Sequence, residues 1–210
     1  MVKVVFFDFD GVILDSAHIK TEAFHELYLP YGTEIARQAK AYHLEHQGVS
    51  RYKKFEYIHN VFLKKDYSEH EGQALSQTFS DIIMDKILKC QFIEGILEFL
   101  TSLKENDIPS FILSATPQKE LVDICRKRKI SVYFSGIFGA PDTKITIGEK
   151  IIKDNHFHRD QILFIGDSIS DLKAANHLKV GFFGRVDTHG SNPFPPEIET
   201  IGNFCEFTLK

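Results

Sequence analysis

Short apolar runs recur along the chain, and each has the length of a buried β-strand. The first covers residues 2–9 and is nearly continuous, as in a parallel strand covered on both faces. The later runs are FILSAT from Phe111, QILFIGDS from Gln161, VGFFG from Val180 and, less distinctly, YFSGIFG from Tyr133. Helical patterns separate them, at residues 94–106, 119–129 and 144–155. Strands alternating with helices of this length predict an α/β fold with a doubly wound parallel sheet.

Residues 16–89 show a different pattern, because apolar positions recur there at helical spacing and no strand-like run stands out. Four helical stretches are punctuated by Pro30, Gly32, Gly48 and Gly72. We therefore expect an all-helical cap domain at residues 16–89, inserted into an α/β core formed by residues 1–15 and 90–210. The alternative is that these helices only thicken the helical layer of the sheet. One crossover rarely needs four helices, which favours a separate cap.

The helical spacing also predicts which side chains form the core of this segment. We expect the apolar residues at these positions to be buried, namely Phe24, Tyr28, Phe55, Tyr57, Ile58 and Phe62. The tail from Val186 contains SNPFPPEIE, which is turn-rich, so we expect it to wrap the surface.

Composition and charge narrow the class of partner. The chain has 210 residues, a net charge of −4 and a pI near 6.2, so no basic surface indicates nucleic acid or an anionic membrane. It has neither a signal-peptide pattern nor an apolar run long enough to span a bilayer. The three cysteines are far apart and fit a reducing cytoplasm. We expect a cytoplasmic protein, a monomer or weak dimer, that acts on a small molecule.

Polar and charged residues lie where the predicted strands end. In strand order they are Asp8 and Asp10, then Ser114, then Lys144, then Asp167 and Asp171. Ligands of open α/β sheets bind beyond the carboxyl ends of the strands, so these side chains are expected to converge. A single aspartate at such a position is more often a helix N-cap than a catalyst. Together, they are the groups needed to bind a metal ion and a phosphoryl group.

These residues resemble the motifs of the haloacid dehalogenase (HAD) superfamily, and in particular its helical-capped (C1) phosphatases, a group similar to phosphoglycolate phosphatase and β-phosphoglucomutase. DFDGVILDS matches the first motif, the serine of LSAT the second, Lys144 of PDTK the third, and GDSISDLKAA the fourth. The four motifs occur in the family's order at the expected strand ends. The resemblance covers most of the predicted core and implies a HAD-like Rossmannoid sheet.

The resemblance implies a mechanism and a metal. Asp8 would be the nucleophile that forms an aspartyl phosphate, and Asp10 the general acid and base. Ser114 and Lys144 would bind the phosphoryl oxygens. Mg²⁺ would be held by Asp8, Asp10 through its backbone carbonyl, and Asp167, with Asp171 acting through water. Alternatively, the acids at residues 167 and 171 only interact with a helix dipole.

The helical segment offers candidates for substrate recognition. GVSRYKK, residues 48–54, resembles the cap loop of β-phosphoglucomutase, which implies that Arg51, with Lys53 or Lys54, binds an anionic substrate group such as a carboxylate or a distal phosphate. Lys20 lies where the chain leaves the core and is a second candidate. The alternative for both is a solvated position on a helix.

The leading hypothesis is a Mg²⁺-dependent phosphomonoesterase for a small phosphorylated metabolite, such as a sugar phosphate or a phosphoglycolate-like compound. A phosphomutase is an alternative suggested by the GVSR loop, although GDSISD matches the phosphatase form of the fourth motif better. A non-enzymatic phospho-acceptor or binding module that uses an aspartate and Mg²⁺ is the third possibility. It would not need the second acid, Asp10, and would show no multiple turnover.

Overall fold

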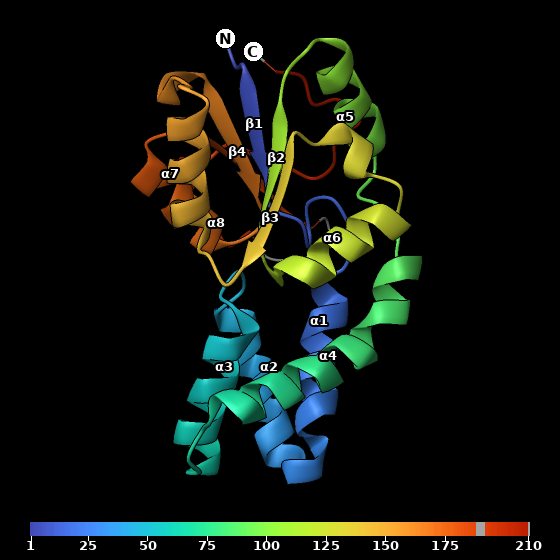
Figure 1. Ribbon diagram of the computed structural model, residues 1–210, viewed down its shortest axis with the longest axis vertical. Helices are drawn as coiled ribbons and strands as arrows, with labels where there is room; N and C mark the ends of the chain where they lie inside the picture. The colour runs from blue at the N-terminus through green and yellow to red at the C-terminus, as the bar shows by residue number, and fades with distance from the viewer. Residues whose placement is uncertain (188–191, 210) are drawn as a thin grey trace.

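The chain folds around one parallel six-stranded sheet, as a computed structural model of residues 1–187 and 192–209 shows (Figure 1). All neighbouring strands pair in parallel. Across the sheet the order is β3 (Gly136–Ala140), β2 (Ser110–Pro117), β1 (Val4–Phe7), β4 (Ile162–Gly166), β5 (Gly181–Arg185) and β6 (Thr200–Ile201). The predicted α/β fold with a parallel sheet is confirmed.

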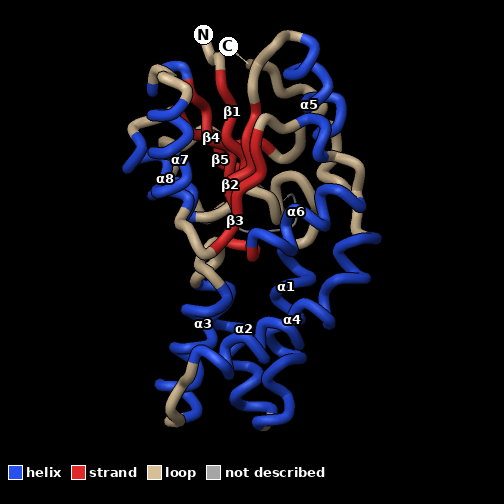
Figure 2. Tube along the Cα trace, viewed as in Figure 1, coloured by secondary structure: helices blue, strands red, loops and turns tan. Residues whose placement is uncertain are grey.

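Helices cover both faces of the sheet, which explains why the first strand is apolar at every position. Side chains alternate between the faces of a strand. Val4 and Phe6 join an apolar cluster with α7 (Lys144–Asp154) and α8 (Ile169–Leu178). Val5 and Phe7 join a second cluster with α5 (Ile96–Glu105) and α6 (Gln118–Lys127). Figure 2 shows the sheet between these two helical layers.

The first strand lies in the middle of the sheet and carries Asp8 to its carboxyl edge. Phe7 pairs with Ile112 of β2 and with Ile165 of β4. The next backbone N–H, that of Asp8, donates to the carbonyl of Ile165 at 2.9 Å. Asp8 is therefore held beside the end of a neighbouring strand, where ligands of parallel sheets bind.

Residues 17–89 are helical and lie beyond the carboxyl edge of the sheet (Figure 1). They form α1 (Ala17–Tyr28), α2 (Thr33–Glu45), α3 (Arg51–Tyr57), a π-helix at Ile58–Leu63 and α4 (Glu69–Lys89). The chain leaves and re-enters the core through adjacent segments. The backbone N–H of Asp15 donates to the carbonyl of Gln91 at 2.9 Å. The backbone N–H of Ile93 donates to the carbonyl of Ile13 at 3.1 Å. This layout supports our proposal of a cap at residues 16–89. No helix in the described part of the chain is both long and apolar enough to cross a membrane.

The predicted core of the helical segment needs one correction. Phe24, Tyr28, Phe55 and Ile58 are buried and Phe62 is half-buried, but the Tyr57 residue is 38% exposed. Two helical residues are about 200° apart around the axis when they are separated by two positions. Tyr57 therefore points away from the face that buries Phe55, and its ring stacks on Tyr42 with centroids 4.1 Å apart.

The tail is less superficial than its composition predicts. Thr200–Ile201 form the sixth strand beside β5. Phe204 is 3% exposed and stacks on Phe99 of α5 with ring centroids 5.3 Å apart. The expectation of a surface wrap missed this strand and this core contact, because a two-residue strand has no periodicity to detect. Ser191 of SNPFPPEIE lies outside the described residues.

Candidate active site

Asp8 forms a buried charge cluster with Lys144 and Asp171. Lys144 Nζ lies 2.8 Å from Asp8 Oδ1 and also donates to Asp171 Oδ1. Both oxygens of Asp171 are occupied, since its Oδ2 accepts from the backbone N–H of Ser168 at 3.1 Å and from the Ser168 hydroxyl at 2.6 Å. Burial disfavours a charge on Lys144, but the two carboxylates raise its pKa above the ordinary value. Lys144 is therefore a cation fixed beside Asp8.

The acids at this edge are too crowded to be ionised without another cation. Burial raises the pKa of Asp8 to about 7 against the opposing effect of Lys144. Burial and the charges of Asp8 and Asp171 raise the pKa of Asp167 well above its ordinary value. One carboxylate oxygen from each of Asp8, Asp167 and Asp171 lies within 4.8 Å of the others. Hard carboxylate oxygens at this spacing fit Mg²⁺.

Asp167 is the acid best suited to bind a metal directly. Neither of its oxygens has a hydrogen bond or an ion pair with another described residue, whereas Asp171 is fully engaged. Gly11 makes room for the Asp167 carboxylate, because a Cβ on Gly11 would lie 2.1 Å from Asp167 Oδ2. The backbone of Gly11 also has φ +77°, which favours glycine. The turn that follows the first strand thus leaves the carboxylate open.

Asp10 is held at the junction of the core and α1. Its carboxylate accepts from the Ser16 hydroxyl at 2.7 Å, from Thr116 Oγ1 at 3.1 Å and from Lys20 Nζ. Burial by itself would raise the pKa of Asp10, but Lys20 and the two hydroxyls outweigh burial and lower the pKa. Asp10 is therefore ionised before substrate binds. Lys20 is not on a solvated helix face, because its side chain is 12% exposed and its partners among the described residues are the core groups Asp10 and Thr116.

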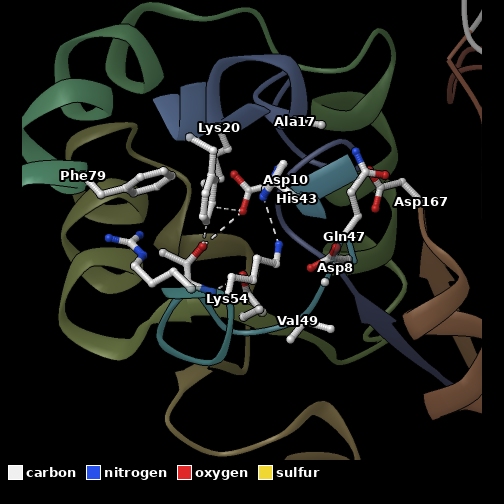
Figure 3. Close-up of a pocket in the computed structure, with 16 residues that line it drawn as sticks. Asp8, Asp10, Ala17, Lys20, His43, Gln47, Val49, Lys54, Phe79 and Asp167 are labelled. Atoms are coloured by element: carbon white, nitrogen blue, oxygen red, sulfur yellow. Dashed lines mark hydrogen bonds and ion pairs between the residues drawn. The ribbon is translucent and has the colours of Figure 1, made fainter. Parts of the chain in front are cut away.

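Ser114 is the candidate phosphate-binding hydroxyl and is 1% exposed. It lies in β2, and its Oγ accepts from the N–H of Thr116 at 3.1 Å. Ser114 lines the same cavity as Asp8, Asp10 and Asp167. Figure 3 labels the three acids in that cavity. The hydroxyl proton of Ser114 is thus left to donate to a ligand in that cavity.

Arg51 lines the cavity from the helical side but is committed to a protein partner. Its guanidinium forms a bidentate ion pair with Glu120 of α6, in which Nη2 donates to Oε1 at 2.5 Å and Nη1 donates to Oε2 at 3.1 Å. Ser80 of α4 accepts from Arg51 at 2.8 Å and donates to Glu120. The guanidinium also lies over the Phe79 ring, 4.6 Å from its centroid. Arg51 is 5% exposed, so the alternative of a solvated helix terminus is wrong for this residue.

A second buried cation, Lys54, lines the cavity one helical turn after Arg51. Lys54 is 3% exposed, and its Nζ lies 2.9 Å from His43 Nδ1 of α2 (Figure 3). The His43 ring in turn stacks on Phe24 of α1, with centroids 4.4 Å apart. Burial and the neighbouring Lys54 charge keep the pKa of His43 well below its usual value, so the imidazole is neutral and its Nδ1 accepts.

The predicted strand-end residues therefore come together, and several of their partners were not anticipated. Asp8, Asp10, Ser114 and Asp167 line one cavity, with Lys144 and Asp171 directly behind Asp8. The candidates Lys20 and Arg51 line it too. The partners missed from the sequence are Ser16, His43 and Glu120. Of these, only Ser16 had a local signal, as a hydroxyl at the start of a predicted helix.

Comparison with known proteins places these residues in a family. The model of the family described as haloacid dehalogenase-like hydrolase matches residues 5–184. Among curated proteins, the chain is 22% identical over 197 residues to phosphoglycolate phosphatase 1 from Pseudomonas aeruginosa, and the match covers 82% of this chain. It covers 65% of that relative, so the chain spans less than two thirds of the relative's length.

Solved structures share this fold over nearly the whole length of the chain. A β-phosphoglucomutase from Clostridium difficile matches with a TM-score of 0.77 at 21% identity, covering 100% of this chain and 94% of that one. A predicted phosphoglycolate phosphatase from Haemophilus somnus matches with a TM-score of 0.73 at 18% identity, covering 97% and 95%. At these identities the likeness establishes the fold alone.

Proposed function

The chain belongs to the haloacid dehalogenase-like hydrolases, and from this premise we propose that it is a Mg²⁺-dependent phosphomonoesterase of the cytoplasm. Its substrate is a small phosphorylated metabolite, of the sugar phosphate or phosphoglycolate type. The observation that carries the proposal is the pairing of two different aspartates in one cavity. Asp8 is buried against Lys144 at 2.8 Å, and Asp10 is held among proton donors two residues later. Phosphate monoester hydrolysis needs these two roles, a nucleophile and an acid–base group.

In the first step a carboxylate oxygen of Asp8 attacks phosphorus. A bond forms between this oxygen and phosphorus while the bond from phosphorus to the leaving alcohol oxygen breaks. Asp10 gives its proton to that oxygen. A phosphate dianion bound nearby raises the pKa of Asp10 and so favours the protonated acid that this step needs. Lys144 and Ser114 bind the negative oxygens of the phosphoryl group.

In the second step Asp10 works as the base. It takes a proton from a water molecule whose oxygen attacks phosphorus, and the bond between phosphorus and Asp8 breaks. The hydrogen bonds from Ser16 and Thr116 orient the Asp10 carboxylate for both proton transfers. Asp8, the backbone carbonyl of Asp10 and Asp167 would hold Mg²⁺. Asp171 was expected to act through water, but both of its oxygens are bonded, so its proposed role is to fix Lys144 behind them. When bound, Mg²⁺ neutralises the charge of the carboxylates and the phosphate.

The test is phosphate release from a panel of phosphorylated sugars, phosphoglycolate, nucleotides and an aryl phosphate, with Mg²⁺ and with a chelator. We expect Mg²⁺-dependent turnover that Asp8→Asn abolishes and that Asp10→Asn lowers by about 10²- to 10⁴-fold. Asp15→Asn is the matched control, because Asp15 is a half-exposed acid on the same segment. Full activity of Asp8→Asn would contradict the proposal.

A phosphomutase is the second candidate, since Gly48, Val49 and Arg51 of the GVSR loop line the same cavity. Transfer of phosphate to a sugar hydroxyl at a higher rate than to water would establish it. A phospho-acceptor module would take up one phosphate per chain and show no multiple turnover. The monomer or weak dimer expected from the sequence is proposed for both enzyme candidates.

A further inference from the structure

The cations that surround the cavity differ in one respect, which is whether a carboxylate neutralises them. Lys20 pairs with Asp10, Arg51 with Glu120, and Lys144 with Asp8 and Asp171. Lys54 has no acidic partner among the described residues, and His43 Nδ1 is its only hydrogen-bond partner there. A buried lysine without a counter-ion is costly, so an anion supplied from outside the chain would relieve that cost.

The surroundings of Lys54 point its ammonium group at a ligand rather than at solvent. Lys54 is 3% exposed and lines the cavity. An ammonium group has three N–H donors, and His43 uses one of them. The ammonium group also lies over the Phe24 ring, 5.4 Å from its centroid, and its two other donors have no hydrogen-bond partner among the described residues. His43 is itself fixed by stacking on Phe24, so the acceptor that positions Lys54 Nζ is held in place.

Lys54 faces the leaving-group side of the reaction. Asp8, Lys144 and Ser114, which take the phosphoryl group, belong to the core, whereas Lys54 and His43 belong to α3 and α2 beyond the edge of the sheet (Figure 1). Asp10, which protonates the leaving oxygen, lines the same cavity as Lys54 and is held there by Lys20 of α1. A group that contacts Lys54 is therefore attached to the leaving oxygen rather than to phosphorus.

We propose that Lys54, positioned by His43, recognises a second anionic group on the leaving-group part of the substrate. This inference rests on the proposed phosphatase function and narrows its substrates to phosphomonoesters that also carry a carboxylate or another phosphate.

Three substrates with one two-carbon skeleton test the proposal and separate the two kinds of anion. They are 2-phosphoglycolate, ethylene glycol bisphosphate and 2-hydroxyethyl phosphate, which carry a carboxylate, a phosphate and a neutral hydroxyl at the distal carbon. We expect wild-type kcat/KM for one of the charged compounds to exceed that for the hydroxyl compound by about 10- to 150-fold, the range for a hydrogen bond to a charged group. The better charged compound names the anion.

Lys54→Met is expected to bring the ratio of kcat/KM for the better charged compound to kcat/KM for 2-hydroxyethyl phosphate close to one. The variant is expected to change kcat/KM for 2-hydroxyethyl phosphate itself by less than about threefold. Lys54→Arg, which keeps the charge, is expected to restore part of the ratio. Lys86→Met, which removes an exposed lysine from α4, serves as the control and leaves the ratio unchanged. An unchanged ratio in Lys54→Met, or equal losses for all three substrates, would overturn the proposal.

The role of His43 has its own readout. His43→Phe keeps a ring to stack on Phe24 but removes the acceptor of the Lys54 hydrogen bond, so KM for the charged substrate is expected to rise with little change in kcat. His43→Gln retains an acceptor and is expected to recover most of the affinity. A fall in kcat with every substrate would show instead that His43 supports the fold.

Binding measurements separate failure of this inference from failure of the proposed function. Calorimetric titration of Asp8→Asn and of Asp8→Asn/Lys54→Met with the three compounds needs no turnover. If wild type hydrolyses none of them but the charged compounds bind Asp8→Asn through Lys54, the proposed function fails and the anion site stands. If the charged compounds bind no better than 2-hydroxyethyl phosphate, or bind equally without Lys54, the anion site is wrong whatever the activity.

Discussion

The ion pair between Arg51 and Glu120 joins the helical segment to the core, and its energetic coupling is the prediction most open to a quantitative test. The two side chains are 5% and 8% exposed. Removing one partner of such a pair leaves a buried charge and costs about 3–5 kcal/mol, whereas replacing both by apolar groups is often neutral. Arg51→Met and Glu120→Leu are each expected to cost about 3 kcal/mol, and the double variant about 1.5 kcal/mol or less.

The free energies of unfolding come from urea titrations of the four proteins, and the double-mutant cycle gives the coupling. Tyrosine fluorescence reports mainly on the helical segment, because all of the 7 tyrosines except Tyr133 lie within residues 16–89. Circular dichroism in parallel detects whether the core unfolds in the same transition. From these costs we expect a coupling free energy of about 4.5 kcal/mol or more.

The exposed pair of Lys86 and Glu26 is the matched control, since it is also an ion pair between two helices but both side chains are 52% exposed. Its coupling is expected to stay below about 1 kcal/mol. If the costs of Arg51→Met and Glu120→Leu simply add, the pair contributes no coupling and the reasoning from burial is refuted.

Three further predictions follow from single positions. Gly11→Ala places a Cβ 2.1 Å from Asp167 Oδ2. We therefore expect both the Mg²⁺ affinity and kcat/KM to fall by about tenfold or more. An unchanged Mg²⁺ titration would contradict this. The buried hydroxyl of Tyr28 has no hydrogen-bond partner among the described residues. Tyr28→Phe is therefore expected to stabilise the protein by about 1 kcal/mol, measured by thermal or urea unfolding. A loss of stability would contradict this and indicate an unseen hydrogen bond. Burial lowers the pKa of Lys54 to about 7, so its charge is present below that pH and lost above it. The preference in kcat/KM for the charged over the neutral two-carbon substrate should therefore fall as pH rises from 7 to 9, and a constant preference would contradict the role of Lys54.

The strand ends were predictable because local patterns determine them. A continuous apolar run predicts a covered strand, and the residue after it must then lie at the carboxyl edge of the sheet. Asp8 and Asp167 were located by this rule alone, before any family was considered. The same rule cannot find Glu120, which lies 69 positions from Arg51 and at the start of an ordinary amphipathic helix. Only the packing of α6 against the helical segment brings the two together.

Buried cations were the main difficulty for sequence analysis, because a lysine has the same local pattern whether or not it is buried. Within RYKK, residues 51–54, the sequence pattern does not distinguish Lys53 from Lys54. In the structure, however, Lys53 is exposed, whereas Lys54 is buried with 3% exposure. Lys20 shows the same problem, since helical spacing alone favoured a solvated face. Its burial depends on Asp10 and Thr116, which reach it from the core.

The two cations of α3 have different consequences for how a substrate enters. The cap loop lies close to the core, since a Cβ on Gly48 would lie 1.9 Å from Ser170 Oγ. A movement of the helices away from the sheet edge that admits a substrate would separate Arg51 from Glu120. The bond that Arg51 loses on opening is regained when the helices return, with or without a substrate. Lys54 gains an anion only when a substrate is present, so its contribution favours closure over a bound substrate, whereas the Arg51 pair favours closure in every case.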